Sequence, residues 1–175
     1  MHYTIPIIVP RKVCLKGAAE VYKYLRRILT PHAEDYLVKP YINRTAAEVA
    51  ALYSKYKTDC TTFEDFATDY FGDCTCFDFE GNEISMQNPD PLYDSWSIPK
   101  TERAFIAVAE TLEQNLQAVL TSRIIDRCGF LHKKHEDAWN FTELPPAEEA
   151  AWNQKFIAIL EASREDYIVH VDCHI

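Results

Sequence analysis

Glycine and long apolar runs are both scarce in this 175-residue chain. It contains only four glycines, which argues against a glycine-rich phosphate-binding loop. No stretch approaches the roughly 18 uncharged apolar residues that a membrane helix needs. The apolar first nine residues are too short for a signal peptide and carry no basic flank. We therefore expect a cytoplasmic protein without a membrane partner, whose six cysteines are reduced thiols or ligands rather than a disulfide set.

Positive charge is absent from the middle of the chain. Residues 59–99 contain ten Asp and Glu and no Lys or Arg, whereas residues 1–58 contain ten Lys and Arg against four Asp and Glu. Such an asymmetry produces a surface field, or it cancels when the two segments pack together. Because the net charge is −9, we interpret the N-terminal basic residues as intramolecular partners of the acidic segment and predict no direct nucleic-acid binding. These basic residues are Arg11, Lys12, Lys16, Lys23, Arg26 and Arg27.

The remaining composition is that of an ordinary globular protein. Hydrophobic residues make up 47% of the chain and charged residues 26%, which is too apolar for intrinsic disorder. The sequence contains no internal repeat and no break in composition. We therefore predict one domain over residues 1–175, a length that suffices to bury a hydrophobic core.

Hydrophobic periodicity predicts a mixture of strands and helices. Strands are expected at about 3–9 and 167–171, with a hairpin of 77–79 and 83–86 between them. The expected helices are 17–29, a brief one from Pro31, 45–57, one from Thr61 with a Thr61–Glu64 capping box, a long one from Thr101 that includes Phe105, and one from Pro146. This order predicts an α+β fold with a small, mainly antiparallel sheet and helices packed on one face.

The acidic run suggests a function in binding. Its carboxylates could form one charged face, with two aromatic anchors from the loop that follows. The face consists of Asp65, Asp69, Asp73, Asp78, Glu80 and Glu83, and the anchors are Tyr93 and Trp96. A surface of this kind can match phosphate charge and occupy a nucleic-acid-binding groove on a basic protein. The alternative is a solvated face that keeps the protein soluble.

Cysteine and histidine also cluster in the last third of the chain. Cys128, His132, His135 and His174 are the residue types that bind zinc, and a zinc-dependent hydrolase is the alternative function. Their spacing matches no standard zinc motif, however. A catalytic Cys–His pair is equally unmarked, because such partners meet in space rather than in sequence. We therefore favour buried cysteines and loop histidines, with no cofactor and no catalysis.

A third alternative is self-assembly. The loop 92–98 carries Tyr93 and Trp96, and these aromatic side chains could form a homodimer contact.

Several short motifs resemble a family of small uncharacterised proteins encoded by phages, prophages and mobile elements of bacteria. They are the segment from Leu29 to Glu34, the turn from Asp78 to Asn82, Asn88-Pro89, and the terminal Val171 to Ile175. The segment from Leu92 to Lys100 departs from the family's loop, because its Gly-Gly-Arg-Trp is missing. The resemblance implies a bacterial host and no particular activity. Together with the acidic run it suggests an anti-defence inhibitor, such as an inhibitor of a CRISPR nuclease.

Overall fold

The computed structural model describes residues 2–56, 62–71, 75–89, 91–99, 105–134 and 144–174. The chain divides into two compact units. Unit 1 comprises residues 1–36 and 89–175, and unit 2 comprises residues 37–88. The division does not test whether the units fold separately, so the single domain over 1–175 stays a prediction.

Unit 1 is built on a mixed sheet in which β1 and β9 are the central strands. Its strands are β1 (His2–Val9), β5 (Ser95–Ser97), β6 (Phe105–Ala107), β7 (Arg123–Ile125), β8 (Leu131–Lys133) and β9 (Tyr167–His174). The order is β5-β9-β1-β7-β8, and β6 pairs with β9 beyond the end of β5. Among the described strand pairs of this sheet, only β1 and β7 run parallel, with Ile7 opposite Ile125. The predicted α+β class and the mainly antiparallel sheet are confirmed.

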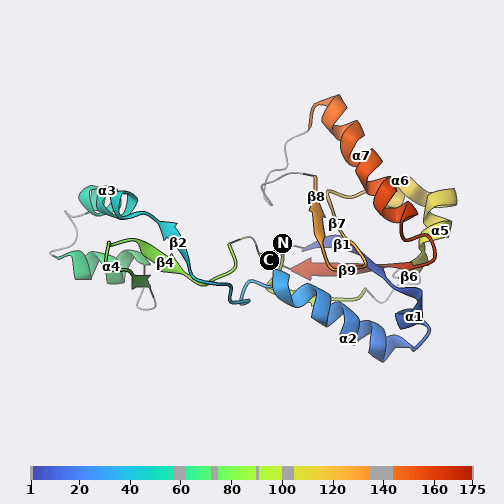
Figure 1. The fold of residues 1–175 in the computed structure, drawn as a ribbon, viewed down its shortest axis with the longest axis horizontal. Helices are drawn as coiled ribbons and strands as arrows, with labels where there is room; N and C mark the ends of the chain where they lie inside the picture. Colours follow the sequence, from blue (N-terminus) through green and yellow to red (C-terminus); the bar gives the residue numbers. More distant parts are fainter. Residues whose placement is uncertain are drawn as a thin grey trace. The chain divides into compact units, whose positions relative to one another are not determined.

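The helices of unit 1 lie on both faces of this sheet (Figure 1). They are α1 (Arg11–Cys14), α2 (Ala18–Leu29), the 3₁₀ turn η1 (Thr30–His32), α5 (Val108–Glu110), the π-helical turn η3 (Thr111–Asn115), α6 (Leu116–Val119) and α7 (Pro146–Glu161). Figure 1 shows α2 on one side and α5 to α7 on the other. The prediction that helices cover one face was therefore wrong.

The central strands explain why both faces are covered. Along β1, Ile5 and Ile7 pack with α2, whereas Ile8 belongs to the second core with Phe156 of α7. Successive side chains of a strand point to opposite faces, so an uninterrupted apolar run gives two apolar faces. Both must be removed from water, and each face therefore needs its own helical layer.

The helix predicted from Thr101 begins later than expected. Phe105 lies in β6, whose residues pair with Tyr167 to Val169 of β9. The helical segment begins at Val108, and residues 101–104 lie outside the described part of the chain. Pairing with the edge of β9 satisfies backbone groups of residues 105–107, and this tertiary contact outweighs the local helical pattern.

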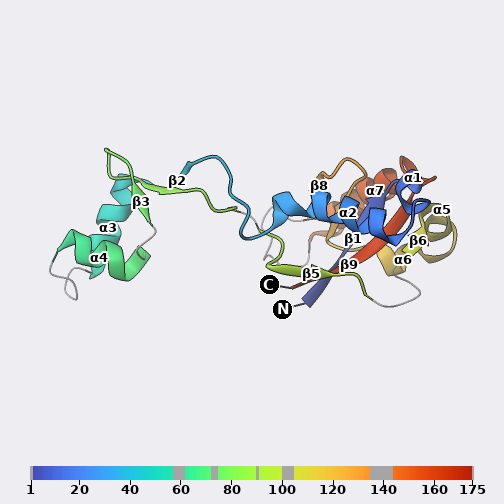
Figure 2. The ribbon, with the colours of Figure 1, turned by 90° about the horizontal axis from the view of Figure 1, so that it is seen from below.

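The described residues of unit 2 form two helices and a three-stranded antiparallel sheet (Figures 1 and 2). Its elements are β2 (Tyr41–Arg44), α3 (Ala46–Tyr56), α4 (Phe63–Phe71), β3 (Cys76–Phe77) and β4 (Glu83–Ser85), in sheet order β2-β4-β3. Its core is aromatic. The buried Phe66 has four ring neighbours, Tyr53, Phe63, Tyr70 and Phe71, with centroids 5.3–5.9 Å from its own.

The capping box of α4 is formed by Thr62 and Asp65, one residue later than predicted. The amide of Asp65 donates to Thr62 Oγ1 at 3.0 Å, and the amide of Thr62 donates to Asp65 Oδ2 at 3.0 Å. These reciprocal bonds satisfy amides that the first helical turn leaves without partners. Because α4 begins at Phe63, the residue that precedes it is the one that caps the helix.

In the described parts of the chain, no helix combines the length and apolar character that a membrane span requires.

Replacing Phe156 by alanine should lower the free energy of unfolding by about 3–5 kcal/mol, because a fully buried ring is removed from the second core of unit 1. Urea denaturation followed by circular dichroism measures the change. Phe130→Ala is the matched control, since the Phe130 side chain is 68% exposed and its loss should cost little. Equal effects of the two variants would contradict the described core.

Candidate functional site

The parallel strands β1 and β7 end on the same side of the sheet, and the two loops that follow them meet there. We refer to this side, where the strands end, as the edge of the sheet. Pro10 and α1 follow β1 directly, and the turn 126–129 follows β7. Asp166 precedes the antiparallel β9 and therefore reaches the same edge. Crevices outside the carboxyl ends of parallel strands are common binding sites in open sheets, because loops rather than paired backbone form them.

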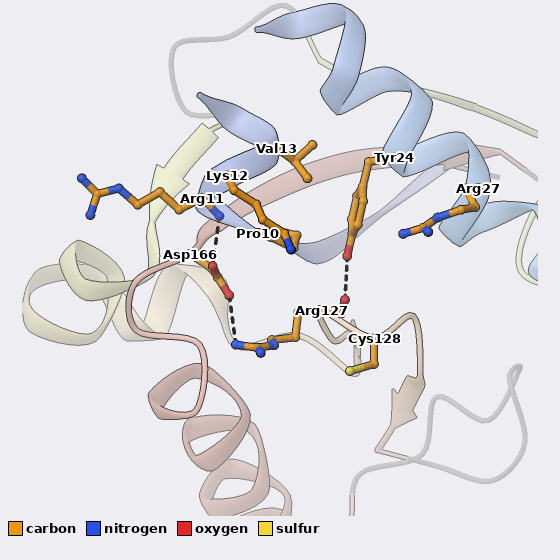
Figure 3. Close-up of a pocket in the computed structure, with 9 residues that line it drawn as sticks. All are labelled: Pro10, Arg11, Lys12, Val13, Tyr24, Arg27, Arg127, Cys128 and Asp166. Carbon is orange, nitrogen blue, oxygen red and sulfur yellow. Dashed lines mark hydrogen bonds and ion pairs between the residues drawn. The ribbon is translucent and has the colours of Figure 1, made fainter. Parts of the chain in front are cut away.

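A hollow of about 650 Å³ lies at this edge, within the usual size of a small-molecule site (Figure 3). We call it the edge pocket. It is lined by Pro10, Arg11, Lys12, Val13, Tyr24, Arg27, Arg127, Cys128 and Asp166.

The edge pocket is strongly basic. Four of its lining residues carry a positive charge: Arg11, Lys12, Arg27 and Arg127. They come from three separate segments, namely α1, α2 and the 126–129 turn. Among the described residues one carboxylate, that of Asp166, lines the pocket with them. The fold therefore gathers positive charge here although the whole chain is acidic.

Asp166 is already engaged within the protein. Its Oδ1 accepts the backbone amide of Arg11 at 3.0 Å, and its Oδ2 lies 3.8 Å from Nη1 of Arg127. Figure 3 shows both interactions. By contrast, within the described ranges no carboxylate forms an ion pair with Lys12 or Arg27. These two cations are accordingly the ones most available to a bound anion.

The 126–129 turn is held in place by Asp126. Its Oδ1 accepts the amides of Cys128 at 2.8 Å and Phe130 at 3.1 Å, and its Oδ2 lies 3.0 Å from Nε2 of His132. Burial raises the pKa of this carboxyl, but the three hydrogen bonds outweigh burial and the net pKa is lowered. Asp126 therefore stays ionised and fixes the backbone that carries Arg127.

Gly129 lets the turn approach α2. Its φ is +91°, and a Cβ built at this position would lie 2.9 Å from Cδ1 of Ile28. An L side chain would be strained at this φ, and its Cβ would have to displace the end of the Ile28 side chain. The hydroxyl of Tyr24 adds a second tie, because it donates to the carbonyl of Arg127 at 2.7 Å. Burial raises the pKa of Tyr24 to about 12, so this wall of the pocket stays uncharged at neutral pH.

The predicted zinc ligands do not all converge. Cys128 and His132 share the β7–β8 hairpin, but His174 pairs with His2 at the far end of β1. His2 precedes Ile7, the partner of Ile125, by five residues, which in a strand is roughly 16 Å. The Nδ1 of His174 instead lies 3.0 Å from Oδ1 of Asp94. His135 lies outside the described residues.

Within the described ranges, no three Cys, His, Asp or Glu side chains are arranged to hold a metal ion. The described residues do not bring Cys128 and His132 together with His174, and a site formed by Cys128, His132, His135 and His174 stays a prediction. The zinc-dependent hydrolase stays a prediction without a site among the described residues.

The predicted acidic face is smaller than the sequence indicates. Glu83 is 7% exposed, and its carboxylate pairs with Arg44 and accepts a hydrogen bond from Asn43 at 2.9 Å. Asp78 stabilises the hairpin turn. Its Oδ1 accepts the amides of Glu80 and Asn82, each at 2.9 Å. Hydrogen bonds from the Asn82 side chain and backbone lower the pKa of Asp78.

The other members of the face divide into two groups. Asp65, Asp69 and Glu80 are exposed, although Asp65 also caps α4. Asp73 lies outside the described residues. Of the five described members of the face, three thus remain as exposed carboxylates of unit 2.

The predicted anchors belong to unit 1, not to the acidic unit 2. Tyr93 is 6% exposed and packs in the α2-side core, so it is a core residue rather than a protruding anchor. Burial raises its pKa to about 12. Trp96 on β5 is half-buried, with its ring 5.1 Å from that of Tyr22. The homodimer through loop 92–98 stays a prediction.

Sequence reasoning found only part of the edge pocket. It grouped Arg11, Lys12 and Arg27 as a basic patch but assigned them to the acidic segment. It missed Arg127 and Asp166 entirely. Their places in the sequence could have identified Arg11 and Arg127 as neighbours. Each stands two residues after a buried strand residue, Val9 for Arg11 and Ile125 for Arg127.

Comparison with known protein families, curated proteins and solved structures finds no match to this chain. The resemblance to phage and prophage proteins, the bacterial host, the inhibitor role and the basic protein partner therefore stay predictions.

Replacing Asp126 by asparagine should lower the free energy of unfolding at pH 7 by about 1–3 kcal/mol, because charged hydrogen bonds to the turn are lost. The folded-state pKa of Asp126 is lowered. Its contribution is therefore complete above the unfolded pKa of about 4 and is lost as the pH falls through the folded pKa. The difference between wild type and variant in urea denaturation should shrink accordingly at acid pH.

Asp35→Asn is the control, because Asp35 is exposed. A stability difference for Asp126→Asn that stays constant from pH 7 to pH 2 would contradict this role of the carboxylate.

Proposed function

We propose that unit 1 is a ligand-binding unit that takes an anionic group, of the phosphate type, into the edge pocket. One observation carries the proposal: three chain segments place the cationic side chains of Lys12, Arg27 and Arg127 around one hollow, and Asp166, the carboxylate that lines it with them, is used internally. Arg11 lines the hollow as well, but its guanidinium points away and lies 3.5 Å from Oε2 of Glu165. Concentrating like charges costs energy unless a counter-ion occupies the space between them. A bound anion removes that cost.

The types of side chain favour phosphate over a simple halide. Guanidinium groups present planar forks of N–H donors that match two oxygens of a phosphate or carboxylate. Arg27 and Arg127 supply two such forks from opposite walls, and Lys12 adds a point charge. The function proposed is binding, and it assigns no catalytic step to the pocket.

Inorganic phosphate should bind wild-type protein, and Lys12→Ala and Arg27→Ala should each weaken binding about tenfold or more, because each removes a charged hydrogen bond. Isothermal titration calorimetry at low salt measures the dissociation constants. Affinity should fall as salt rises, since the pocket is open and its cations are screened.

Lys23→Ala is the matched control. Lys23 is an exposed cation of the same helix α2, its Nζ lies 2.7 Å from Oε1 of Glu20, and it does not line the pocket. Removing it changes the net charge equally but should leave phosphate binding unchanged. No binding by wild type, or equal losses in all three variants, would contradict the proposal.

A second candidate function is the binding of a basic protein by unit 2. Phe79 favours this function, because its side chain is fully exposed at the hairpin turn, next to the exposed carboxylate of Glu80. An exposed aromatic ring beside acidic residues can anchor a basic partner. This role would make Phe79, rather than Tyr93, the aromatic contact of the acidic face.

A pull-down from bacterial lysate tests this second function by comparing wild type with Phe79→Ala/Glu80→Lys. We expect a basic protein that wild type retains and the double variant loses. Phe130→Ala/Glu148→Lys, in which an exposed aromatic and an exposed acid of unit 1 are changed instead, should retain it. Retention by all three proteins would contradict a role for the hairpin turn.

A further inference from the structure

A second hollow, of about 520 Å³, lies on the other side of the 126–129 turn, against α7. We call it the α7 hollow. It is lined by Asp126, Arg127, Cys128, His132, Lys155, Ala158, Ile159, Ala162 and Ser163. Arg127 and Cys128 line both this hollow and the edge pocket, so the two meet along these residues.

The walls of the α7 hollow differ from those of the edge pocket. Ala158 of α7 and Ala162, the residue that caps the C-terminus of this helix, stand one turn apart on the same side, and Ile159 lies beside them. Small side chains at this spacing leave a shallow apolar surface along the helix. A flat ring can lie on such a surface, whereas a hydrated phosphate gains nothing there.

Two polar side chains border this apolar surface. The His132 ring is mostly buried, with 23% of its side chain exposed, and Asp126 fixes it through Nε2 at 3.0 Å. Lys155 of α7 also lines the hollow, and its ammonium group lies 5.8 Å from the centre of the Trp152 ring, one turn earlier on the helix. A planar ligand with ring nitrogens or an exocyclic polar group would find a positioned ring to stack on and a cation at its edge.

We infer that the ligand of this protein is a phosphate monoester with a flat aromatic body, of the nucleoside monophosphate type. Its phosphate would occupy the edge pocket and its ring the α7 hollow, with Arg127 between the two. This inference rests on the proposed function, because it assigns the phosphate to the same cations. It adds the chemical class of the rest of the ligand, namely a flat aromatic ring attached to the phosphate.

Calorimetric titrations with inorganic phosphate, ribose 5-phosphate and adenosine 5′-monophosphate test the inference. Adenosine 5′-monophosphate should bind at least about tenfold more tightly than ribose 5-phosphate, because stacking of a base is worth a factor of that size. Ala158→Trp should abolish this advantage by filling the α7 hollow, and it should leave inorganic phosphate binding unchanged. Ala158 is exposed, so the substitution should not disturb the core.

Ala151→Trp is the matched control, since Ala151 is an exposed residue two turns earlier on α7 and lies outside the hollow. It should bind all three probes as wild type does. Lys155→Ala provides a second test without a bulky side chain, and should weaken binding of adenosine 5′-monophosphate but not of inorganic phosphate.

The outcomes separate the two proposals. The inference is overturned if inorganic phosphate binds but adenosine 5′-monophosphate binds no more tightly than ribose 5-phosphate. It is also overturned if adenosine 5′-monophosphate still binds more tightly than ribose 5-phosphate in Ala158→Trp. In both cases the proposed function stands. Failure of all three probes to bind overturns both.

Discussion

The pairing of β1 with β9 is the interaction on which unit 1 depends. The two strands are antiparallel over eight residue pairs, from His2 opposite His174 to Val9 opposite Tyr167. The other edge of β1 receives β7, and the other edge of β9 receives β5 and β6. Nearly all further strands therefore attach to this central pair, and side chains of β1 and β9 supply both cores. A slip of one residue in the pairing would exchange the two faces and bury the wrong side chains.

This pairing also determines where charge accumulates. Because β1 and β7 run parallel, the segments that follow them meet at one sheet edge, where Asp166 enters β9. Arg11 and Arg127 are far apart in sequence but share the edge pocket for this reason. The carboxylate of Asp166 holds both, through the amide of Arg11 and the guanidinium of Arg127. The basic pocket of an acidic protein is thus a product of topology.

Local patterns predicted the longer helices and the strands β1, β3, β4 and β9, but not the short strands β2, β5 and β8. The apolar run of β1 and the helical period of α2 marked those elements correctly, because burial on a fixed face leaves a periodic trace in the sequence. Phe105 was misread because its strand exists only through pairing with β9. Coverage of both sheet faces was also missed, although the unbroken apolar run of β1 is the pattern that implies it.

For the candidate site, too, the sequence indicated local features but not the contacts between residues that are far apart in the chain. Charge counting treated all carboxylates of the acidic run as surface, yet Glu83 is buried against Arg44 and Asp78 closes a turn. Whether a carboxylate faces water or satisfies backbone amides depends on contacts that charge alone does not encode. The pocket cations Arg27 and Arg127 come from segments about a hundred residues apart, so no motif could join them.

The most direct test of the central claim is a ¹H–¹⁵N correlation spectrum of the protein titrated with inorganic phosphate. Anion binding in the edge pocket predicts saturable shifts concentrated at the amides of residues 11–13 and 127–129, with unit 2 unaffected. An unchanged spectrum at millimolar phosphate, or shifts located mainly in residues 37–88, would contradict the assignment of the edge pocket as an anion-binding site.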